Sequence, residues 1–306
     1  MATSLTGRTL TTLDAPASGR TAVVTGNVRG FLRRFTRNKG ATISAVILIV
    51  LIVVSIDAVG SRLAPFEPNK ILAGPKLDGP NSATYFGTDQ LGRDVFSRTI
   101  YGGRLTLSSS LIGVILAAVI GVLAGLTAGY LGGWIDSIIL RLVDIMLAFP
   151  GILLTLAVVA VLGPGVRNIQ VAVGISLIPP FVRLARGSVL AAKNDEYVVA
   201  ATTLGCRPWR VMVRHILPNV MTSILVLFTT AIGWAMIIAT SLSFLGLGVS
   251  PPDPEWGSDM KAALTYLQHA WWMAAPGIAI TITIISVNLL GDGLQDALDP
   301  YSKRKL

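Results

Sequence analysis

The sequence contains a single cysteine, Cys206, and only two histidines, His215 and His269. One cysteine cannot form an intrachain disulfide, and two isolated histidines without a second thiol argue against a metal site. The sequence also lacks a GxxxxGK[ST] phosphate-binding loop, which excludes ATP hydrolysis by the usual P-loop arrangement. We therefore expect no catalytic residue, no metal and no cofactor in this chain, so the energy for its function must come from a partner.

Charged residues are sparse. Asp, Glu, Lys and Arg make up 13% of the 306 residues, whereas hydrophobic residues make up 52% and the mean hydropathy is +0.68. A soluble domain carries about 25% charged residues. Uncharged stretches that can cross a bilayer recur along the chain. This composition excludes an ordinary soluble domain and predicts a polytopic membrane protein.

Six stretches can be placed as transmembrane helices within a membrane domain at 41–300. They lie at residues 41–57, 105–135, 145–166, 168–182, 216–252 and 272–290. The second and fifth stretches exceed the roughly 20 residues that a spanning helix needs, so we expect them to include extramembrane ends or a broken helix. The predicted fold class is all-α, with six transmembrane helices.

Basic residues are distributed unevenly over the two sides that these stretches define. With the N-terminus inside, 17 of the 25 Lys and Arg residues lie on the cytoplasmic side and 8 lie outside. Because cytoplasmic loops retain Lys and Arg, both termini are predicted to be cytoplasmic, with an outside loop at 61–104 and a cytoplasmic loop at 183–218. The net charge of +9 follows this topology and forms no continuous patch, so we expect no nucleic-acid partner.

Both ends of the chain are predicted to be cytoplasmic tails, at residues 1–40 and 301–306. The first tail is expected to be largely disordered to about residue 28, because Thr, Ser, Gly and Ala recur there without periodicity. No apolar stretch precedes residue 41, so we expect no cleaved signal peptide.

The cytoplasmic loop contains the most informative segment, KNDEYVVAATTLGCRPWRVMVRHILPN. Asn194 or Asp195 is predicted to cap a short helix. Gly205 then allows a tight reversal, because a residue without Cβ tolerates positive φ. Pro208 begins a second short helix and Pro218 ends it. Such a helix–Gly–helix elbow is suited to docking into a groove on another protein.

The outside loop ends in YFGTDQLGRDVFSRTIYGGRLTL. In this segment Val95 and Ile100 lie on an apolar side, whereas Ser97 and Arg98 lie on a polar side. This pattern predicts an interfacial helix at the membrane surface.

The elbow resembles the EAA loop of permease subunits of bacterial ATP-binding-cassette importers. Val199 stands where that family usually has Glu, and His215 stands where it usually has an apolar residue, although acidic residues lie one turn earlier. The alternative is an ordinary cytoplasmic loop. The resemblance implies that these residues couple the permease to the ATPase: Asp195, Glu196, Val199, Ala200, Ala201, Gly205, Pro208, His215, Leu217 and Pro218.

Three further segments resemble permeases for di- and oligopeptides, a class that includes nickel importers. They are the GTDQLGRD motif at 87–94, SFLGLGVSPPDPEWGSDM at 243–260 and GDGLQDALDP at 291–300. With the elbow, the resemblance covers about residues 41–300. It identifies the chain as similar to the second, C-type permease of a peptide-class importer.

Small residues recur every four positions in the second stretch, at Gly113, Ala117, Gly121, Gly125 and Gly129. Such a stripe allows close helix contact. We expect it to pack within one subunit, and the alternative is that it lines a pore.

Charged residues and prolines within the predicted stretches allow more than one interpretation. Arg141 and Asp144 can pair on one helix face, whereas a proton relay through Asp136 or Asp144 is the sharper hypothesis. Pro150 and the pair at 179–180 are predicted to break or kink their helices.

The resemblance implies a permease subunit of an ATP-driven importer in the bacterial inner membrane, with no enzymatic activity of its own. Together with a homologous permease it would form the path for di- or oligopeptides. Its partners would be that permease, one or two ATPase chains or a fused ATPase, an extracytoplasmic solute-binding protein and membrane lipid. The alternatives are a permease for nickel, haem or another solute of the class, and a proton-coupled secondary transporter. A secondary transporter requires carboxylates near the midplane of the membrane, and the centres of the six stretches lack them.

Overall fold

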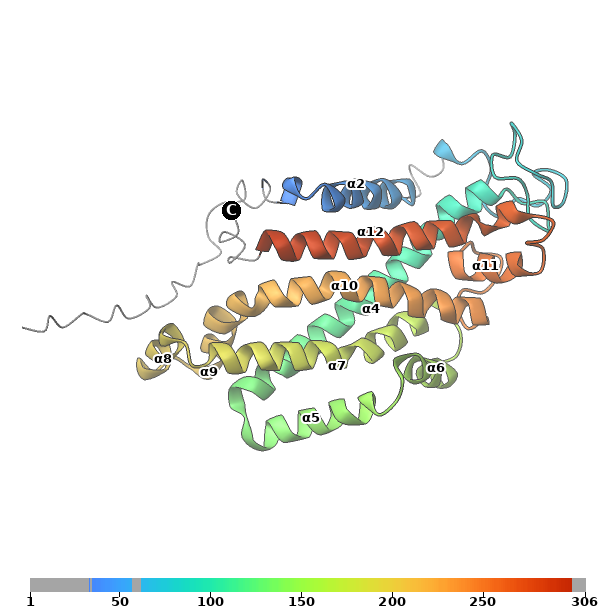
Figure 1. Ribbon diagram of the computed structural model, residues 1–306. Coiled ribbons are helices and arrows are strands. Elements are labelled where there is room, and N and C mark those ends of the chain that lie inside the picture. Colours follow the sequence, from blue (N-terminus) through green and yellow to red (C-terminus); the bar gives the residue numbers. More distant parts are fainter. Residues whose placement is uncertain (1–32, 34, 57–61, 299–306) are drawn as a thin grey trace, which may run out of the picture.

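The computed structural model describes residues 33, 35–56 and 62–298; the predicted tails therefore lie largely or wholly outside the described residues. The regular secondary structure of the described residues is helical, apart from an isolated antiparallel bridge between Thr88 and Asp94. The long helices lie side by side, with α8 and α9 at one end of the bundle and α11 at the other (Figure 1). In chain order the helices are α2 (Lys39–Val54), α4 (Val95–Leu131), α5 (Gly133–Leu147), α6 (Gly151–Leu162), α7 (Val166–Ala192), α8 (Glu196–Thr203), α9 (Pro208–Arg210), the π-helical turn η1 (Val211–Ile216), α10 (Leu217–Leu245), α11 (Trp256–Leu264), the 3₁₀ turn η2 (Trp271–Ala274) and α12 (Ala275–Leu298).

Four continuous helical segments among the described residues are long and apolar enough to cross a membrane, and there are five if the bent pair α5–α6 counts as one span. The four are Val95–Leu131, Val166–Ala192, Pro208–Leu245 and Trp271–Leu298. The apolar helix α2, with 16 residues, is shorter than they are. The all-α membrane fold is thus confirmed, whereas the count of six spanning helices stays a prediction.

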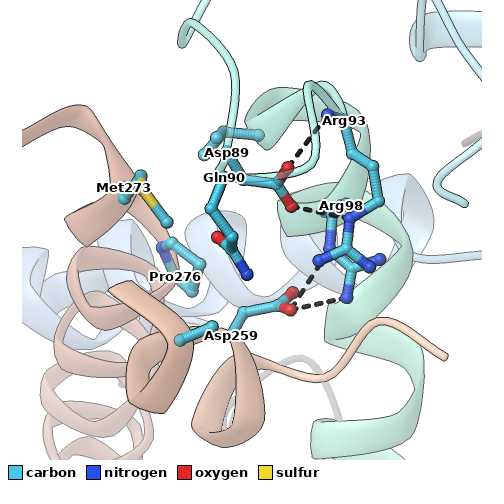
Figure 2. Close-up of a pocket in the computed structure, with 9 residues that line it drawn as sticks. Asp89, Gln90, Arg93, Arg98, Asp259, Met273 and Pro276 are labelled. Atoms are coloured by element: carbon cyan, nitrogen blue, oxygen red, sulfur yellow. Dashed lines mark hydrogen bonds and ion pairs between the residues drawn. The ribbon is translucent and has the colours of Figure 1, made fainter. Parts of the chain in front are cut away.

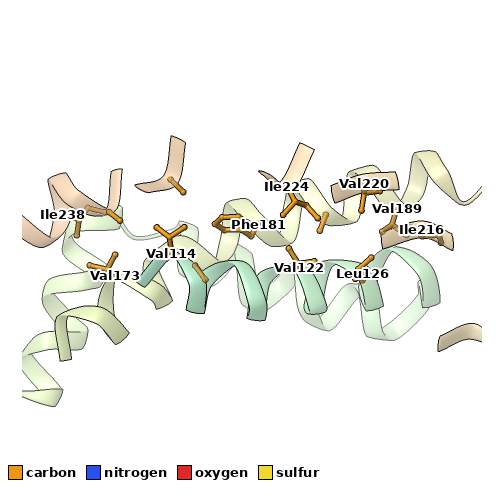
Figure 3. Packing of buried hydrophobic residues seen from close by; sticks show 14 of the residues in the cluster. Val114, Val122, Leu126, Val173, Phe181, Val189, Ile216, Val220, Ile224 and Ile238 are labelled. Carbon is orange, nitrogen blue, oxygen red and sulfur yellow. The ribbon is translucent and has the colours of Figure 1, made fainter. Parts of the chain in front are cut away.

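The centre of the bundle is the contact between α4 and α7, which α10 covers. Figure 3 shows valines of α4 facing Val173, Phe181 and Val189, with Ile224 of α10 close by. The small-residue stripe makes this contact possible. A Cβ on Gly121 would lie 2.5 Å from Phe181 Cβ, and one on Gly125 would lie 2.6 Å from the carbonyl oxygen of Val182. The stripe therefore packs within one subunit, as expected.

The third predicted span is wrong in its boundaries. The structure replaces 145–166 by two helices, α5 and α6, which meet at an angle of 92°. The break lies at Pro150, which has φ −53° and ψ 134° and precedes the first residue of α6. Proline lacks the N–H that would continue the ladder, so the expected break at this residue is present.

The fourth predicted span is too short. Helix α7 continues ten residues beyond 182 and carries Pro179 and Pro180 in its interior without ending there. Pro179 is buried and Pro180 is half-buried, and the residues on either side of them, Ile178 and Phe181, pack against Gly121 of α4. Tertiary packing therefore overrides the local preference of proline for helix ends.

The predicted interfacial helix, with Val95 and Ile100 on its apolar side, is not a separate element. Residues 95–100 form the first turns of α4, which runs for 37 residues from Val95. Asp94 caps this helix, since its Oδ2 accepts a hydrogen bond from Ser97 N at 2.8 Å. The long second stretch ends instead at Gly132, with φ +65°, where α5 turns back along α7.

Candidate functional site

The elbow has the expected helix–Gly–helix geometry. Asp195 is the N-cap residue of α8, and Leu204 ends that helix. Gly205 follows with φ +78°. Its N–H donates to Thr202 O at 3.0 Å, and Cys206 N–H donates to Ala201 O at 3.1 Å. These two bonds define a Schellman motif, which needs a left-handed residue at the glycine position.

The second arm of the elbow differs from the prediction. Pro208 begins α9 as expected, but Pro218 does not end a helix. The backbone passes through the π-helical turn η1 into α10, so that Pro208–Leu245 is one helical segment. A wide turn just before Pro218 provides room for a ring that an α-helical turn would exclude. The second arm is therefore continuous with a membrane helix.

The predicted coupling residues fall into two groups. Glu196, Val199 and Ala200 lie on the exposed side of α8, and Gly205, Pro208 and Pro218 are also exposed. Ala201 is buried, and His215 and Leu217 are half-buried. Ala201 packs with Val198 against the main hydrophobic cluster. Of the alanine pair, only Ala200 is available to a partner.

Tyr197 and Lys193 fix the elbow to the membrane helices. The Asn219 side chain of α10 donates to Tyr197 Oη at 2.9 Å, and Lys193 Nζ donates to Tyr130 O of α4 at 2.8 Å. Burial raises the pKa of the Tyr197 phenol, and the nearby Asp195 carboxylate acts in the same direction. The phenol stays neutral at physiological pH, and these hydrogen bonds join the elbow to α4 and α10.

Sequence reasoning missed the exposed apolar and basic surface next to Gly205. Leu204 and Trp209 are exposed large apolar side chains. With Arg207 and Arg210 they line an open concavity, together with Gly205, Cys206, Val213 and Arg214. The arginine spacing of i, i+3 and i+7 in RPWRVMVR was a signal for one helix face. Leu204 and Trp209 follow no period, and the exposure of these two side chains was not predictable from the sequence.

The GTDQLGRD motif forms a compact turn (Figure 2), at the end of the bundle opposite the elbow (Figure 1). Asp89 accepts from the backbone N–H groups of Leu91 and Arg93 at 2.8 and 2.9 Å. Its other oxygen pairs with Arg93 Nε at 2.6 Å, and both side chains are buried. A carboxylate with three donors is well compensated for its burial. The motif is therefore a structural turn that leads into Asp94, the cap of α4, and Trp272 Nε1 donates to Thr88 O in it at 3.1 Å.

Arg98 connects this turn to distant segments. Its Nη2 pairs with Asp259 Oδ1 at 2.5 Å (Figure 2). Its Nη1 lies 3.1 Å from Pro68 O, 3.1 Å from Asn69 Oδ1 and 3.2 Å from Pro252 O. Arg98 is buried, so the polar side predicted to face water faces the protein instead.

Burial disfavours the ionised form of the Asp259 carboxyl. Burial raises its pKa to about 6, although the Arg98 guanidinium acts in the opposite direction. Its Oδ2 accepts no hydrogen bond from the described residues, and the same holds for the nearby Gln90 Oε1. An ionised oxygen without a donor explains why burial outweighs the ion pair.

The segment at 243–260 completes the cap at this end of the bundle. Trp256 is fully buried and its Nε1 donates to Thr99 O of α4 at 2.7 Å. Glu255 caps α11 by accepting from Ser258 N at 2.8 Å, and its other oxygen accepts from Thr106 Oγ1 at 3.0 Å. The motifs at 87–94 and 243–260, far apart in sequence, thus meet at the start of α4.

Comparison with known families covers most of the chain. Residues 121–304 match the model of the binding-protein-dependent transport system inner membrane component. Residues 28–80 match the N-terminal TM domain of oligopeptide transport permease C. The first match alone covers more than half of the 306 residues.

Relatives match over nearly their whole length. The glutathione transport system permease protein GsiD of Pectobacterium atrosepticum is 44% identical over 277 residues, which cover 90% of this chain and 91% of the relative. The GsiD proteins of Escherichia coli and Shigella sonnei are each 46% identical over 275 residues, which cover 89% of this chain and 90% of the relative. These relatives are membrane permease subunits and not enzymes. The chain belongs to the family of binding-protein-dependent transport system inner membrane components, as a permease subunit of an ATP-driven importer of the peptide class.

Proposed function

We propose that this permease pairs with a homologous permease and forms the path for di- and oligopeptides that a solute-binding protein delivers. The match to the oligopeptide permease model supports this solute class. The relatives named for glutathione, itself a modified tripeptide, support it as well. Nickel, haem and other solutes of the class are the alternatives.

The observation that carries the mechanism is the elbow. Its exposed side presents Val199, Ala200, Leu204 and Trp209, and its buried side is fixed to α4 and α10. An ATPase subunit would dock on the exposed side. Closure of the ATPase would then move α8, and the long helices would convert this movement into opening on the other side of the membrane.

The proposed orientation places both termini and the elbow in the cytoplasm, and the cap at the opposite end on the external side. The 17-to-8 distribution of basic residues supports it. In intact cells an impermeant thiol reagent should leave Cys206 unmodified, and labelling of Cys206 from outside would contradict this orientation.

Replacement of Ala200 or Gly205 tests the docking role. Ala200→Arg places a charge on the docking side, and Gly205→Val puts a β-branched residue at φ +78°, which costs roughly 1 kcal/mol or more and tilts α8. We expect both variants to insert and pair normally but to lose co-purification of the ATPase. Gly151→Val is the matched control, because an added Cβ meets nothing within 4 Å at Gly151 or at Gly205. Normal ATPase binding by both elbow variants would show that the elbow is only a loop.

A further inference from the structure

Helix α5 carries two different exposed stripes on the edge of the bundle, where it lies along α7 (Figure 1). At 100° per residue, the stripes are separated by about a quarter turn of the helix. One stripe is apolar and consists of Trp134, Ile138, Leu142 and Ile145. The other is polar and consists of Ser137, Arg141 and Asp144.

Asp144 pairs with Arg183 of α7 and not with Arg141, which corrects the expected pair. Arg183 Nη2 lies 2.8 Å from Asp144 Oδ1, and the two side chains are 55% and 64% exposed. The second pair between these helices is different. Arg186 holds Asp136 through two bonds of 2.6 and 2.7 Å, with side chains 28% and 19% exposed. The partly buried pair of Asp136 and Arg186 joins α5 to α7, whereas the pair of Asp144 and Arg183 is exposed.

The exposed pair of Asp144 and Arg183 lies far along α5 and α7 from the helix ends nearest the elbow. The start of α5 and the end of α7 lie at the level of the elbow, where Lys193 contacts Tyr130. At 1.5 Å per residue, Asp144 lies about 16 Å along α5 from this end and Arg183 about 14 Å along α7. Exposed Leu142 and Ile145 lie at the same depth. An exposed ion pair at a depth where the neighbouring stripe is apolar is too costly to face lipid.

We propose that the Asp144–Arg183 side of α5 and α7 lines the solute pathway and provides a carboxylate and a guanidinium for the charged groups of a passing peptide. The chemistry fits such a ligand. An exposed ion pair contributes little stability, so a peptide ammonium can replace Arg183 at Asp144, and a peptide carboxylate can replace Asp144 at Arg183. Arg183 makes one bond within the described residues and keeps further N–H donors.

Other polar groups extend the same side. Arg141 is exposed on the polar stripe of α5. Ser176 lies seven residues before Arg183, on the same face of α7. Its carbonyl cannot accept the usual helical bond, because Pro180 has no N–H. A peptide moving along α7 would therefore meet acceptors as well as donors.

Water accessibility tests the pathway without reference to the solute. Asp144→Cys and Leu142→Cys place a thiol at two neighbouring positions that are both exposed in the single chain, at the same depth. The assembled importer in nanodiscs is treated with a charged methanethiosulfonate, with native Cys206 as the common background. We expect position 144 to react about tenfold faster or more than position 142, because only one of them borders water. Equal modification rates at positions 142 and 144 would overturn the assignment of this side to the pathway. It would also be overturned if position 144 were unreactive because the second permease covers it.

Charge selectivity tests the contact itself, and this part depends on the proposed peptide import. Proteoliposomes receive binding protein saturated with peptides that differ only in one Lys or Glu side chain. Asp144→Asn should lower uptake of the Lys peptide about tenfold relative to the Glu peptide, and Arg183→Gln should do the reverse, which is the scale of one charge-assisted contact. Leu142→Asn is the control and should not discriminate.

The two tests separate the two proposals. If the unmodified importer transports neither peptide although position 144 is reactive, the proposed solute is wrong and the pathway remains. If it transports both while position 144 is unreactive, or if both variants affect both peptides equally, the solute stands and the Asp144–Arg183 contact is refuted.

Discussion

Arg98 shows how one buried charge organises the end of the molecule opposite the elbow, because it joins Asp259 of α11 to the backbone of Pro68 and Pro252. The loop at 64–94 has no regular helix of its own to position it. A guanidinium with five donors provides this positioning, and Lys could not reproduce it. Gly205 has the corresponding role at the elbow, where its positive φ sets the angle between α8 and the second arm.

The raised pKa of Asp259 predicts a pH dependence of the cap opposite the elbow. Its folded pKa of about 6 exceeds the ordinary value of 3.8. Between about pH 4 and 6 the unfolded chain therefore releases a proton that the folded chain still holds. The free energy of unfolding should fall as pH rises through this window, by up to about 3 kcal/mol from this group.

Asp259→Asn should remove this contribution, since the amide does not titrate. The measurement is the apparent melting temperature in detergent from pH 4 to 7. Asp253→Asn, at an exposed position before α11, is the control and should keep the wild-type slope. A slope unchanged in Asp259→Asn would mean that this carboxyl is not the titrating group.

At the scale of elements, the contact between α4 and α7 holds the bundle together through its small residues. Lipid provides no hydrophobic driving force between helices, so close packing has to supply the attraction. The clamp between Asp136 and Arg186 adds α5 to this pair. Helix α2 joins on the far side, where Asn38 Nδ2 donates to Asp296 Oδ2 of α12 at 3.2 Å.

A single methyl group should measure the closeness of this packing. In Gly121→Ala the new Cβ would lie 2.5 Å from Phe181 Cβ and 3.0 Å from Ile178 O, atoms that no side-chain rotation can move. The helices have to separate, at a cost of about 1–3 kcal/mol. Gly187→Ala in α7 is the matched control, because its Cβ meets nothing within 4 Å and alanine favours the helix. The same melting temperature for both variants in detergent would disprove the close contact.

The sequence predicted elements better than their boundaries. The four-residue period of small side chains identified the packing face of α4, and Pro150 and Gly205 identified a break and a reversal. Pro179, Pro180 and Pro218 misled the prediction, because neighbouring helices and a π-helical turn accommodate rings that would end an isolated helix. Burial of Arg98 could not be predicted either. Its partner Asp259 lies 161 residues away, and local amphipathicity predicted water on that side instead.

On the scale of the whole molecule, the described chain connects an elbow at one end with a charged cap at the other. Helices α4 and α10 contact both ends (Figure 1). Lys193 and Asn219 fix the elbow to them, and Thr106 and Trp256 join α4 to the cap. In the proposed mechanism, a docked ATPase would therefore act on the opposite end of the bundle through these helices.

Uptake into proteoliposomes tests this account most directly. The permease is reconstituted with its companion permease, the ATPase and peptide-loaded binding protein, and accumulation of labelled peptide is measured with ATP, without ATP, and with a proton gradient alone. We expect accumulation only when ATP and the complete assembly are present, and we expect the Gly205→Val variant to lose it. Accumulation driven by a proton gradient without ATP would contradict it and would identify a secondary transporter.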